Sequence, residues 1–522
     1  MIEEFLKLLF LLSISLFYFY SVSGFGKTLK NKYSNYFDLQ FEGTIILLIL
    51  GYAIYITIGI SVYLNILILS LGIIFYFFIG ENLIKVDFKY LLLFFLLIFS
   101  VLVISKTHED FNGYHYFSIH EVFNNRLRIG VSYLNERFFH SSLLVFNQAL
   151  IVLPYLDLKL VHLPIFIIYL SSLGYFIFIV FSKTVKRDEL FFSIFCLLVL
   201  LIKFNRLSEF GYDYIAQFIL LVVFHKIYFL NSNNEELVRA ILYFTLCVLI
   251  KPISLFFFPI MIYILFKRGI FFFRDFSSIR YFLFFLLVAT FISSSFFKTG
   301  CLFYPLNSSC FTKDKVFWSE KKRVGDYSKM AQLWAKSYYN QNNYEKGSRY
   351  EKIEDKDLYL KKFNWFKFWV ETHFFYKVSE FLLILLLTFI LIYFYFVKLK
   401  EEDTKKNKDK YIILILSFFS TFFWLNTAPQ FRFGFSSIII LFFFLFSVTL
   451  NLNIEFSKKK IINLFIVGLL VLNIKNLNRI KNEFSRDDFY KFNNFPFYNE
   501  IKITNDYSGY EIDNFLHVEI IR

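Results

Sequence analysis

A chain of 522 residues that is 57% hydrophobic and 23% aromatic carries more apolar side chains than a soluble fold needs. Its net charge of +15 would suggest nucleic-acid binding in a soluble protein, but here the lysines and arginines gather in short loops between apolar runs, as in cytoplasmic loops. Repeated apolar runs of about twenty residues predict an all-α polytopic integral membrane protein with the lipid bilayer as its surroundings and no nucleic-acid partner.

The N-terminal part of the chain predicts four spans. Residues 5–22 lack a basic start and a small-residue cleavage site, so this run predicts a retained span and not a signal peptide. The run 44–79 is too long for one crossing and predicts a pair of helices that turns near 61–65. Lysines between the first two spans place that loop in the cytoplasm, so the span at 88–105 is expected to lead outward.

This fourth span leads into a polar segment, 106–143, that we expect to be the first large outer loop. It opens with two adjacent carboxylates among histidines and a tyrosine: His108, Glu109, Asp110, Tyr114 and His115. Ionisable groups packed at the end of a span cost desolvation energy and usually mark a site. The alternative is a solvated loop with ordinary polar residues, and position alone leaves both interpretations open.

The remaining apolar runs bring the expected number of spans to about fourteen, and nearly every short lysine-rich loop then falls in the cytoplasm. These runs are 162–181, 190–202, 214–230, 237–250, 253–266, 281–297, 378–397, 411–425, 435–452 and 461–474. The expected organisation is a transmembrane region at 1–297, a long extracytoplasmic loop at 298–377, a second transmembrane region at 378–474 and a polar tail at 475–522. The tail is expected outside if 461–474 is a true span.

Three short outer turns each carry a charge that is expensive at a span end. Lys251 stands between two apolar runs and is either a phosphate ligand or a lysine that snorkels to the interface. Arg432 suits bidentate phosphate recognition or headgroup anchoring. Asp213 begins an apolar run, where it lines a site or caps a helix. Cations for a lipid phosphate and a carboxylate for proton abstraction are adequate for group transfer from a lipid-phosphate donor.

The cysteines and the long outer loop leave two questions open. Cys301 and Cys310 are close enough in sequence for a disulfide if their loop faces an oxidising compartment, and Cys196 and Cys247 lie within apolar runs. The loop carrying Trp334 and Trp365 either folds over the site and stacks on sugar rings or is a passive subdomain. The sequence contains no Walker loop, no GxGxxG and no metal-ligand spacing.

Several short motifs occur in order along most of the chain. They are His108-Glu109-Asp110-Phe111, Tyr114-His115, Arg128-Ile129-Gly130, Asn135-Glu136-Arg137-Phe138, His140-Ser141-Ser142, Ser208-Glu209-x-Gly211-x-Asp213, Ile250-Lys251-Pro252-Ile253-Ser254, Thr299-Gly300-Cys301-x-x-Tyr304-Pro305 and Pro429-x-x-Arg432-Phe433. As an ordered set they resemble a bacterial group of polytopic membrane proteins similar to the GT-C fold glycosyltransferases, which use polyprenyl-phosphate-linked sugars. The acidic pair is Glu-Asp here, whereas its first position is often Asp in that group.

The resemblance implies a role for each of these charged residues. Asp110 would be the catalytic base, and Glu109 its partner or a ligand of a divalent metal ion; no other cofactor is expected. Lys251 and Arg432 would hold the donor phosphate, and Asp213 would line the site. The remaining expected substrate-binding residues are His108, Tyr114, His115 and Arg137.

The function expected from this resemblance is transfer of a sugar from a polyprenyl-phosphate donor to a cell-surface glycan or glycolipid. The reaction would take place on the extracytoplasmic face of a bacterial inner membrane. The alternatives are a surface-polysaccharide polymerase of the O-antigen type and a transporter or flippase of lipid-linked sugars. A transporter predicts charged residues deep within spans and internal repeats.

Overall fold

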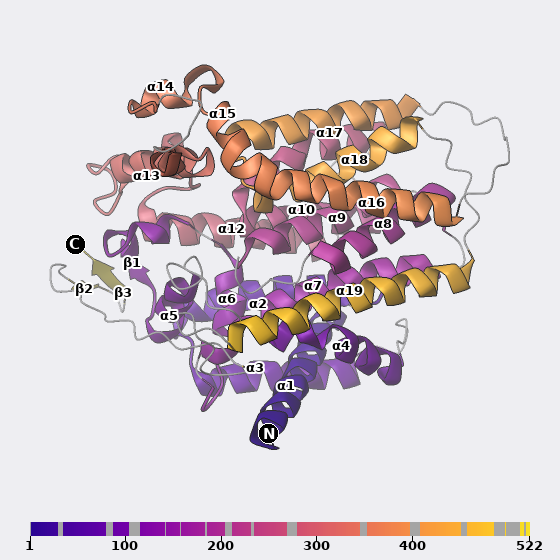
Figure 1. The fold of residues 1–522 in the computed structure, drawn as a ribbon. Coiled ribbons are helices and arrows are strands. Elements are labelled where there is room, and N and C mark those ends of the chain that lie inside the picture. The colour runs from indigo at the N-terminus through magenta and orange to yellow at the C-terminus, as the bar shows by residue number, and fades with distance from the viewer. Residues whose placement is uncertain are drawn as a thin grey trace.

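The computed structural model describes most of the chain as packed helices (Figure 1). The described residues are 2–29, 35–79, 87–103, 115–140, 142–156, 158–182, 185–203, 211–230, 234–268, 279–344, 352–396, 408–449, 457–484, 496, 512–515 and 518–521. The first helices are α1 (Ile2–Lys27), α2 (Asp38–Thr57), α3 (Val62–Phe78), α4 (Phe88–Val103), α5 (Tyr116–Asn124), α6 (Leu144–Ala149), α7 (Leu163–Phe181), α8 (Arg187–Lys203), α9 (Asp213–Tyr228) and α10 (Asn234–Ile250).

The second half continues in the same way. Its helices are α11 (Phe258–Lys267), α12 (Ile279–Thr299), α13 (Lys321–Ala335), α14 (Lys356–Leu360), α15 (Phe366–Trp369), α16 (Ser379–Phe396), α17 (Lys408–Thr427), α18 (Phe435–Thr449) and α19 (Lys458–Phe484). Short 3-10 turns include η2 (Val131–Tyr133), η3 (Glu136–Phe139), η4 (Leu158–Leu160), η6 (Pro252–Phe257), η7 (Asn307–Ser309), η8 (Tyr338–Tyr344), η9 (Lys361–Phe363) and η11 (Phe431–Phe433), and η10 (Val370–Val378) is a π-helix.

Over its described residues, every apolar run expected to span a membrane lies on a helix. Seven helical segments in the described part of the chain are long and apolar enough to cross a bilayer, and four apolar helices are shorter. The pair expected at 44–79 turns between Thr57 and Val62, slightly earlier than expected, because Ser61 caps α3 by accepting a hydrogen bond from the Leu64 backbone N–H. The protein is therefore an all-α membrane protein, as its composition predicts.

Burial differs widely among these helices and identifies the centre of the bundle. In the segment Leu158–Phe181, which contains α7, 89% of the residues in the apolar 18-residue stretch are buried. In α17 the corresponding share is 22%. Helices α8, α9 and α10 are also buried along most of their lengths. The long helices run side by side, so the ends of the helices lie at two opposite ends of the bundle (Figure 1).

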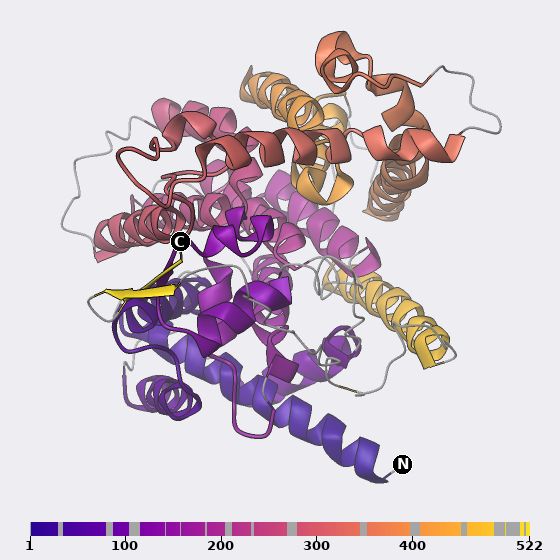
Figure 2. The same ribbon diagram turned by 90° about the vertical axis from the view of Figure 1, so that its left-hand side faces the viewer.

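One end of the bundle carries a small sheet, and we call it the sheet end. Strand β1 (Arg128–Ile129) pairs in parallel with β3 (Val518–Ile521), which pairs antiparallel with β2 (Ile512–Phe515). Glu519 stands opposite Arg128 in this register. The C-terminal strands thus lie beside the first polar segment, together with α5 and α13 (Figures 1 and 2).

The polar region after α12 also lies at the sheet end. Cys301 and Cys310 are joined by a disulfide, and the cluster around them includes Phe139, Tyr304 and Val324. Phe139 belongs to η3 and Val324 to α13, so the two polar segments pack against each other. The helical segment that leaves this region begins at Phe366, because α15 and η10 continue directly into α16.

Candidate functional site

Asp213 lies at the centre of a charged cluster at the sheet end. It is the first residue of α9 and its side chain is fully buried. Its Oδ1 lies 2.5 Å from Lys251 Nζ, and its Oδ2 lies 3.0 Å from Arg432 Nε. The side chain of Lys251 is 18% exposed to solvent and that of Arg432 is 11% exposed. A single buried carboxylate therefore gathers two cations that still reach solvent.

Local chain geometry places Lys251 beside Asp213. Lys251 has extended backbone angles and directly follows α10, and Pro252 starts η6. Proline suits the first position of a helix, where its missing N–H leaves no bond unmade. The Lys251 N–H donates to the Cys247 carbonyl at 2.8 Å, and its carbonyl accepts from Ser254 at 3.0 Å. The corner is therefore fixed by backbone hydrogen bonds on both sides of Lys251.

Arg432 is held by an equally well anchored turn. The His373 ring Nε2 accepts from the Phe431 N–H at 2.9 Å. Trp369 Nε1 donates to the Pro429 carbonyl at 2.7 Å, and Gln430 Nε2 donates to the Ala335 carbonyl at 3.0 Å. Contacts from α13, α15 and η10 thus fix the backbone on which Arg432 stands.

Aromatic rings surround both cations. The Arg432 guanidinium carbon lies 5.2 Å from the Trp334 ring centre and 5.3 Å from that of Phe433, and Lys251 Nζ lies 4.8 Å from the Phe433 ring centre. At these distances the rings attract the cations. Trp334 is partly exposed on α13, so the polar region after α12 does reach the charged cluster. Trp365, in contrast, is buried beneath Lys336.

His115 borders the same cluster from the start of α5. Its ring is fully buried and meets the Tyr212 ring edge-on, with 4.2 Å between centres. Gly211 has φ +54°, and a Cβ there would lie 2.4 Å from His115 Nε2, so this close approach requires glycine. Burial lowers the pKa of His115 well below its usual range, and the positive charges of Lys251 and Arg432 lower it further. His115 is therefore a neutral imidazole at pH 7.

His140 and Arg137, which also belong to the first polar segment, stand near His115. The positive charges of His140 and Arg137 add to the effects that lower its pKa. His140 lies against Tyr304 and Tyr327, with ring centres 5.1 and 5.4 Å apart, whereas Arg137 is exposed. The segment thus reaches the cluster on one side and the region after α12 on the other.

Arg128, which belongs to the motifs quoted above, has a structural role. Its Nη1 lies 3.1 Å from Glu121 Oε1, and its Nε lies 2.8 Å from Glu519 Oε2. Burial raises the pKa of the Glu121 carboxyl, and the Arg128 charge opposes that shift. The arginine therefore ties α5 and strand β3 together.

The expected site residues divide into two groups. Asp213, Lys251 and Arg432 are in contact, the charges of Lys251 and Arg432 act on His115, and that of Arg137 acts on His115 as well. His108, Glu109, Asp110 and Tyr114 lie outside the described residues. Both expected ligands of a divalent metal ion, Glu109 and Asp110, are among these four residues.

Sequence reasoning missed the contact of Trp334 with Arg432 and the packing of Tyr212 on His115. It also missed a buried charge network at the opposite end of the bundle. Lys226 Nζ lies 2.9 Å from Asp38 Oδ2 and 2.6 Å from Glu236 Oε2, and Glu42 contacts Arg239 at 3.1 Å and Arg280 at 2.6 Å. Lys226 and Arg239 fall within predicted spans, and that position was the available signal.

Comparison with known proteins gives one family match. A family described as a domain of unknown function (DUF8201) matches residues 1–439. The matched range contains His115, Asp213, Lys251 and Arg432 and ends before α19. No curated protein and no solved structure matches the chain.

Proposed function

We propose that this chain, which belongs to the DUF8201 family, is a membrane glycosyltransferase that transfers a sugar from a polyprenyl-phosphate donor to a cell-surface glycan or glycolipid. The observation that carries the proposal is the pairing of Lys251 and Arg432 on one buried carboxylate. Counted over the described residues, the cluster holds two cations and one carboxylate, a net positive charge. Such a cluster at the end of a helical bundle suits a lipid phosphate.

The two cations offer different hydrogen-bond donors to a phosphate. Lys251 carries an ammonium with three N–H donors. Arg432 carries a planar guanidinium with five N–H donors, and a pair of them can bind one phosphate. The contact of Arg432 with Asp213 is made through Nε. Asp213 holds both side chains at a fixed position, which lowers the conformational entropy that binding would otherwise remove. The neutral imidazole of His115 beside them adds no competing positive charge.

The proposed reaction is a direct displacement at the anomeric carbon. The acceptor hydroxyl oxygen forms a bond to that carbon, the bond to the phosphate oxygen breaks, and its electron pair leaves with polyprenyl phosphate. Asp110 takes the hydroxyl proton, and Lys251 and Arg432 stabilise the charge that develops on the leaving phosphate. Displacement in one step inverts the anomeric configuration.

The sheet end is proposed to face the periplasm or exterior. Disulfides persist in oxidising compartments, and the Cys301–Cys310 bond lies at this end. Lys267, Lys408 and Lys458 stand at the ends of α11, α17 and α19 that lie away from this end, where the positive-inside rule expects cytoplasmic charge. This orientation puts the cluster on the same face as the growing surface glycan.

A transporter of lipid-linked sugars is the second candidate, and the buried charge network favours it. Lys226, Asp38, Glu236, Arg239 and Glu42 are buried within the helical bundle. Such groups line ion or substrate pathways in many transporters. However, each cation of the network contacts at least one carboxylate, as expected for a structural tie between helices.

Sugar transfer by the full-length protein in proteoliposomes tests the proposal. Polyprenyl-phosphate monosugar labelled in the sugar is supplied with a cell-envelope glycan fraction as acceptor, and the products are separated. We expect labelled glycan and free polyprenyl phosphate, and we expect Asp110→Asn to abolish both while the protein remains folded and inserted.

Full activity of Asp110→Asn would reject the assigned base. Consumption of a lipid-diphosphate oligosaccharide in place of the monosugar donor would identify a polymerase. Movement of the donor across the bilayer without a new glycosidic bond would identify a transporter.

A further inference from the structure

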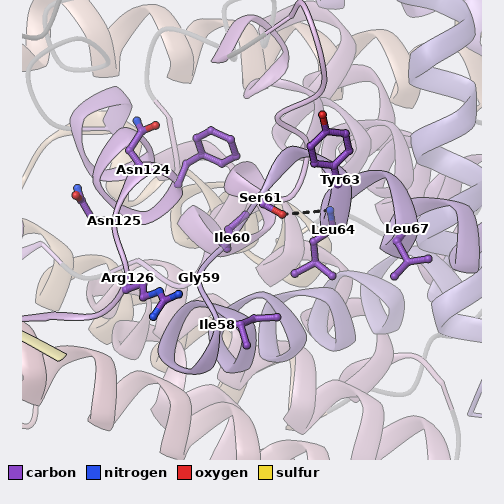
Figure 3. Close-up of a pocket in the computed structure, with 11 residues that line it drawn as sticks. Ile58, Gly59, Ile60, Ser61, Tyr63, Leu64, Leu67, Asn124, Asn125 and Arg126 are labelled. Carbon is purple, nitrogen blue, oxygen red and sulfur yellow. Dashed lines mark hydrogen bonds between the residues drawn. The ribbon is translucent and has the colours of Figure 1, made fainter. Parts of the chain in front are cut away.

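A groove of about 690 Å³ lies where the α2–α3 turn meets the end of α5 (Figure 3). Its apolar lining is Ile58, Ile60, Tyr63, Leu64, Leu67 and Phe123, and its polar lining is Ser61, Asn124, Asn125 and Arg126. The groove is separate from the charged cluster. His115 stands at one end of α5 and Asn124 at the other, about 14 Å apart along the helix.

Arg126 and its neighbour Arg128 differ in burial and in their carboxylate partners. Arg128 is buried and contacts Glu121 and Glu519. Arg126 is exposed, and no carboxylate of the described residues contacts it. Asn125 also bonds to Glu121, through a 2.9 Å hydrogen bond from Nδ2 to Oε2. The nearby carboxylate is therefore committed to Arg128 and Asn125, and the Arg126 charge is available to an anion from outside the chain.

The stem of Arg126 is placed by the α2–α3 turn. Gly59 has φ +82°, and a Cβ there would lie 3.1 Å from Arg126 Cγ. The glycine lets the aliphatic part of the arginine lie directly against the turn. This contact places the aliphatic stem of Arg126 beside the turn, and its side chain lines the groove.

An exposed apolar stripe leads away from the groove along α3. Its residues are Tyr63, Leu67, Leu71, Ile74 and Phe78, all more than one-third exposed. Their spacing of three and four residues puts them on one face of the helix. The stripe is about 22 Å long, whereas the hydrocarbon core of a bilayer is about 30 Å thick, so the stripe extends through more than one leaflet. Hydrocarbon chains of the membrane are the natural partner of such a face.

We propose that this groove binds a bilayer phospholipid with an anionic headgroup. Arg126 contacts the headgroup phosphate, the asparagine amides donate further hydrogen bonds, and one acyl chain lies along the α3 stripe. A free phosphate ion would find a single cation and an apolar wall, which is a poor fit. The site does not depend on the proposed sugar transfer, because none of its lining residues belongs to the charged cluster.

Native mass spectrometry of the full-length protein in detergent tests the proposal. The protein is titrated with phosphatidylglycerol, or with phosphatidylcholine of the same acyl chains. We expect phosphatidylglycerol to bind more tightly, and Arg126→Gln to weaken its binding by about tenfold or more. Lys315→Gln is the matched control, because Lys315 is exposed at the same end and does not line the groove, and it should change nothing.

A second pair of variants tests the tail position without changing charge. Leu67→Trp fills the groove from its exposed side and should weaken the binding of both lipids, whereas Leu387→Trp, which is equally exposed on α16 and lies outside both groove and stripe, should not. Unchanged phosphatidylglycerol affinity in Arg126→Gln would overturn the proposal. So would displacement by inorganic phosphate alone, or tighter binding of polyprenyl phosphate than of phosphatidylglycerol.

Discussion

Replacing Asp213 by asparagine removes the only carboxylate that contacts both Lys251 and Arg432 in the described structure, with almost no change of shape. The carboxylate is fully buried, and its removal leaves two cations side by side. Loss of one partner of a buried ion pair costs about 3–5 kcal/mol, because the remaining charge, here that of Lys251, loses its carboxylate. Since the two cations are partly exposed and can regain water, we expect the lower end, about 3 kcal/mol.

A double-mutant cycle isolates the ion pair from the other effects of the substitution. Lys251→Met alone should cost about 1–2 kcal/mol, because Arg432 still compensates Asp213. In the Asp213→Asn background the same change should cost nothing or stabilise, because it removes an uncompensated cation. The assay is the free energy of unfolding of the purified full-length protein in detergent.

The control is Asp357→Asn, which breaks a surface pair with Lys329 at 2.7 Å and should cost less than about 1 kcal/mol. Two results would refute the reasoning. One is an Asp213→Asn variant as stable as the wild type. The other is a Lys251→Met effect that is the same in both backgrounds, because independent residues would give additive costs.

Three further predictions concern His115, its glycine neighbour and the opposite end of the bundle. Because the pKa of His115 is lower in the folded chain than its ordinary value of 6.5, stability should fall as the pH falls below about 6.5, by up to about 1.4 kcal/mol per unit. His115→Gln should remove that part of the slope in thermal unfolding scans, and an unchanged slope would contradict the assignment. Gly211→Ala should destabilise by about 1–3 kcal/mol, because the new Cβ meets the His115 ring at positive φ; a neutral effect on melting temperature would show that the close approach is wrong. Glu42→Gln should cost about 3–5 kcal/mol, measured by chemical unfolding, and more than Asp409→Asn, whose lysine partner is half exposed.

The helical architecture was predictable because the signal is long and repetitive. Each expected span is a run of apolar side chains about as long as a bilayer is thick. In lipid the backbone must bond within such a run, and a helix satisfies that requirement. Helix ends were less predictable. The helix expected from residue 378 begins at Phe366, since α15 and η10 carry polar residues that lower the hydropathy of the run without breaking the helix.

The charged cluster was predictable in its members but not in its geometry. Asp213, Lys251 and Arg432 are each conspicuous as charges at apolar span ends. That one carboxylate contacts both cations depends on how α9, α10 and η11 pack, and no local pattern encodes it. Trp334 and Trp365 were both candidates to fold over the site, and the sequence did not distinguish Trp334, which contacts Arg432, from Trp365, which is buried.

The buried network shows the opposite limitation. Lys226 and Arg239 lie near helix ends, where they read as loop-flanking charges of the positive-inside pattern. Their carboxylate partners come from α2 and α10, and Asp38 and Lys226 are separated by most of the N-terminal half. Pairing over such a distance in sequence is a property of the fold and not of any segment.

Polyprenyl phosphate affinity tests the central claim most directly. It is measured for the full-length wild type, for Lys251→Met and Arg432→Met, and for Lys322→Met, which removes an exposed charge from α13 at the same end. The account predicts that the first two variants bind at least about tenfold more weakly and that the third binds like the wild type. Equal affinity in all four proteins would contradict a phosphate site at Lys251 and Arg432.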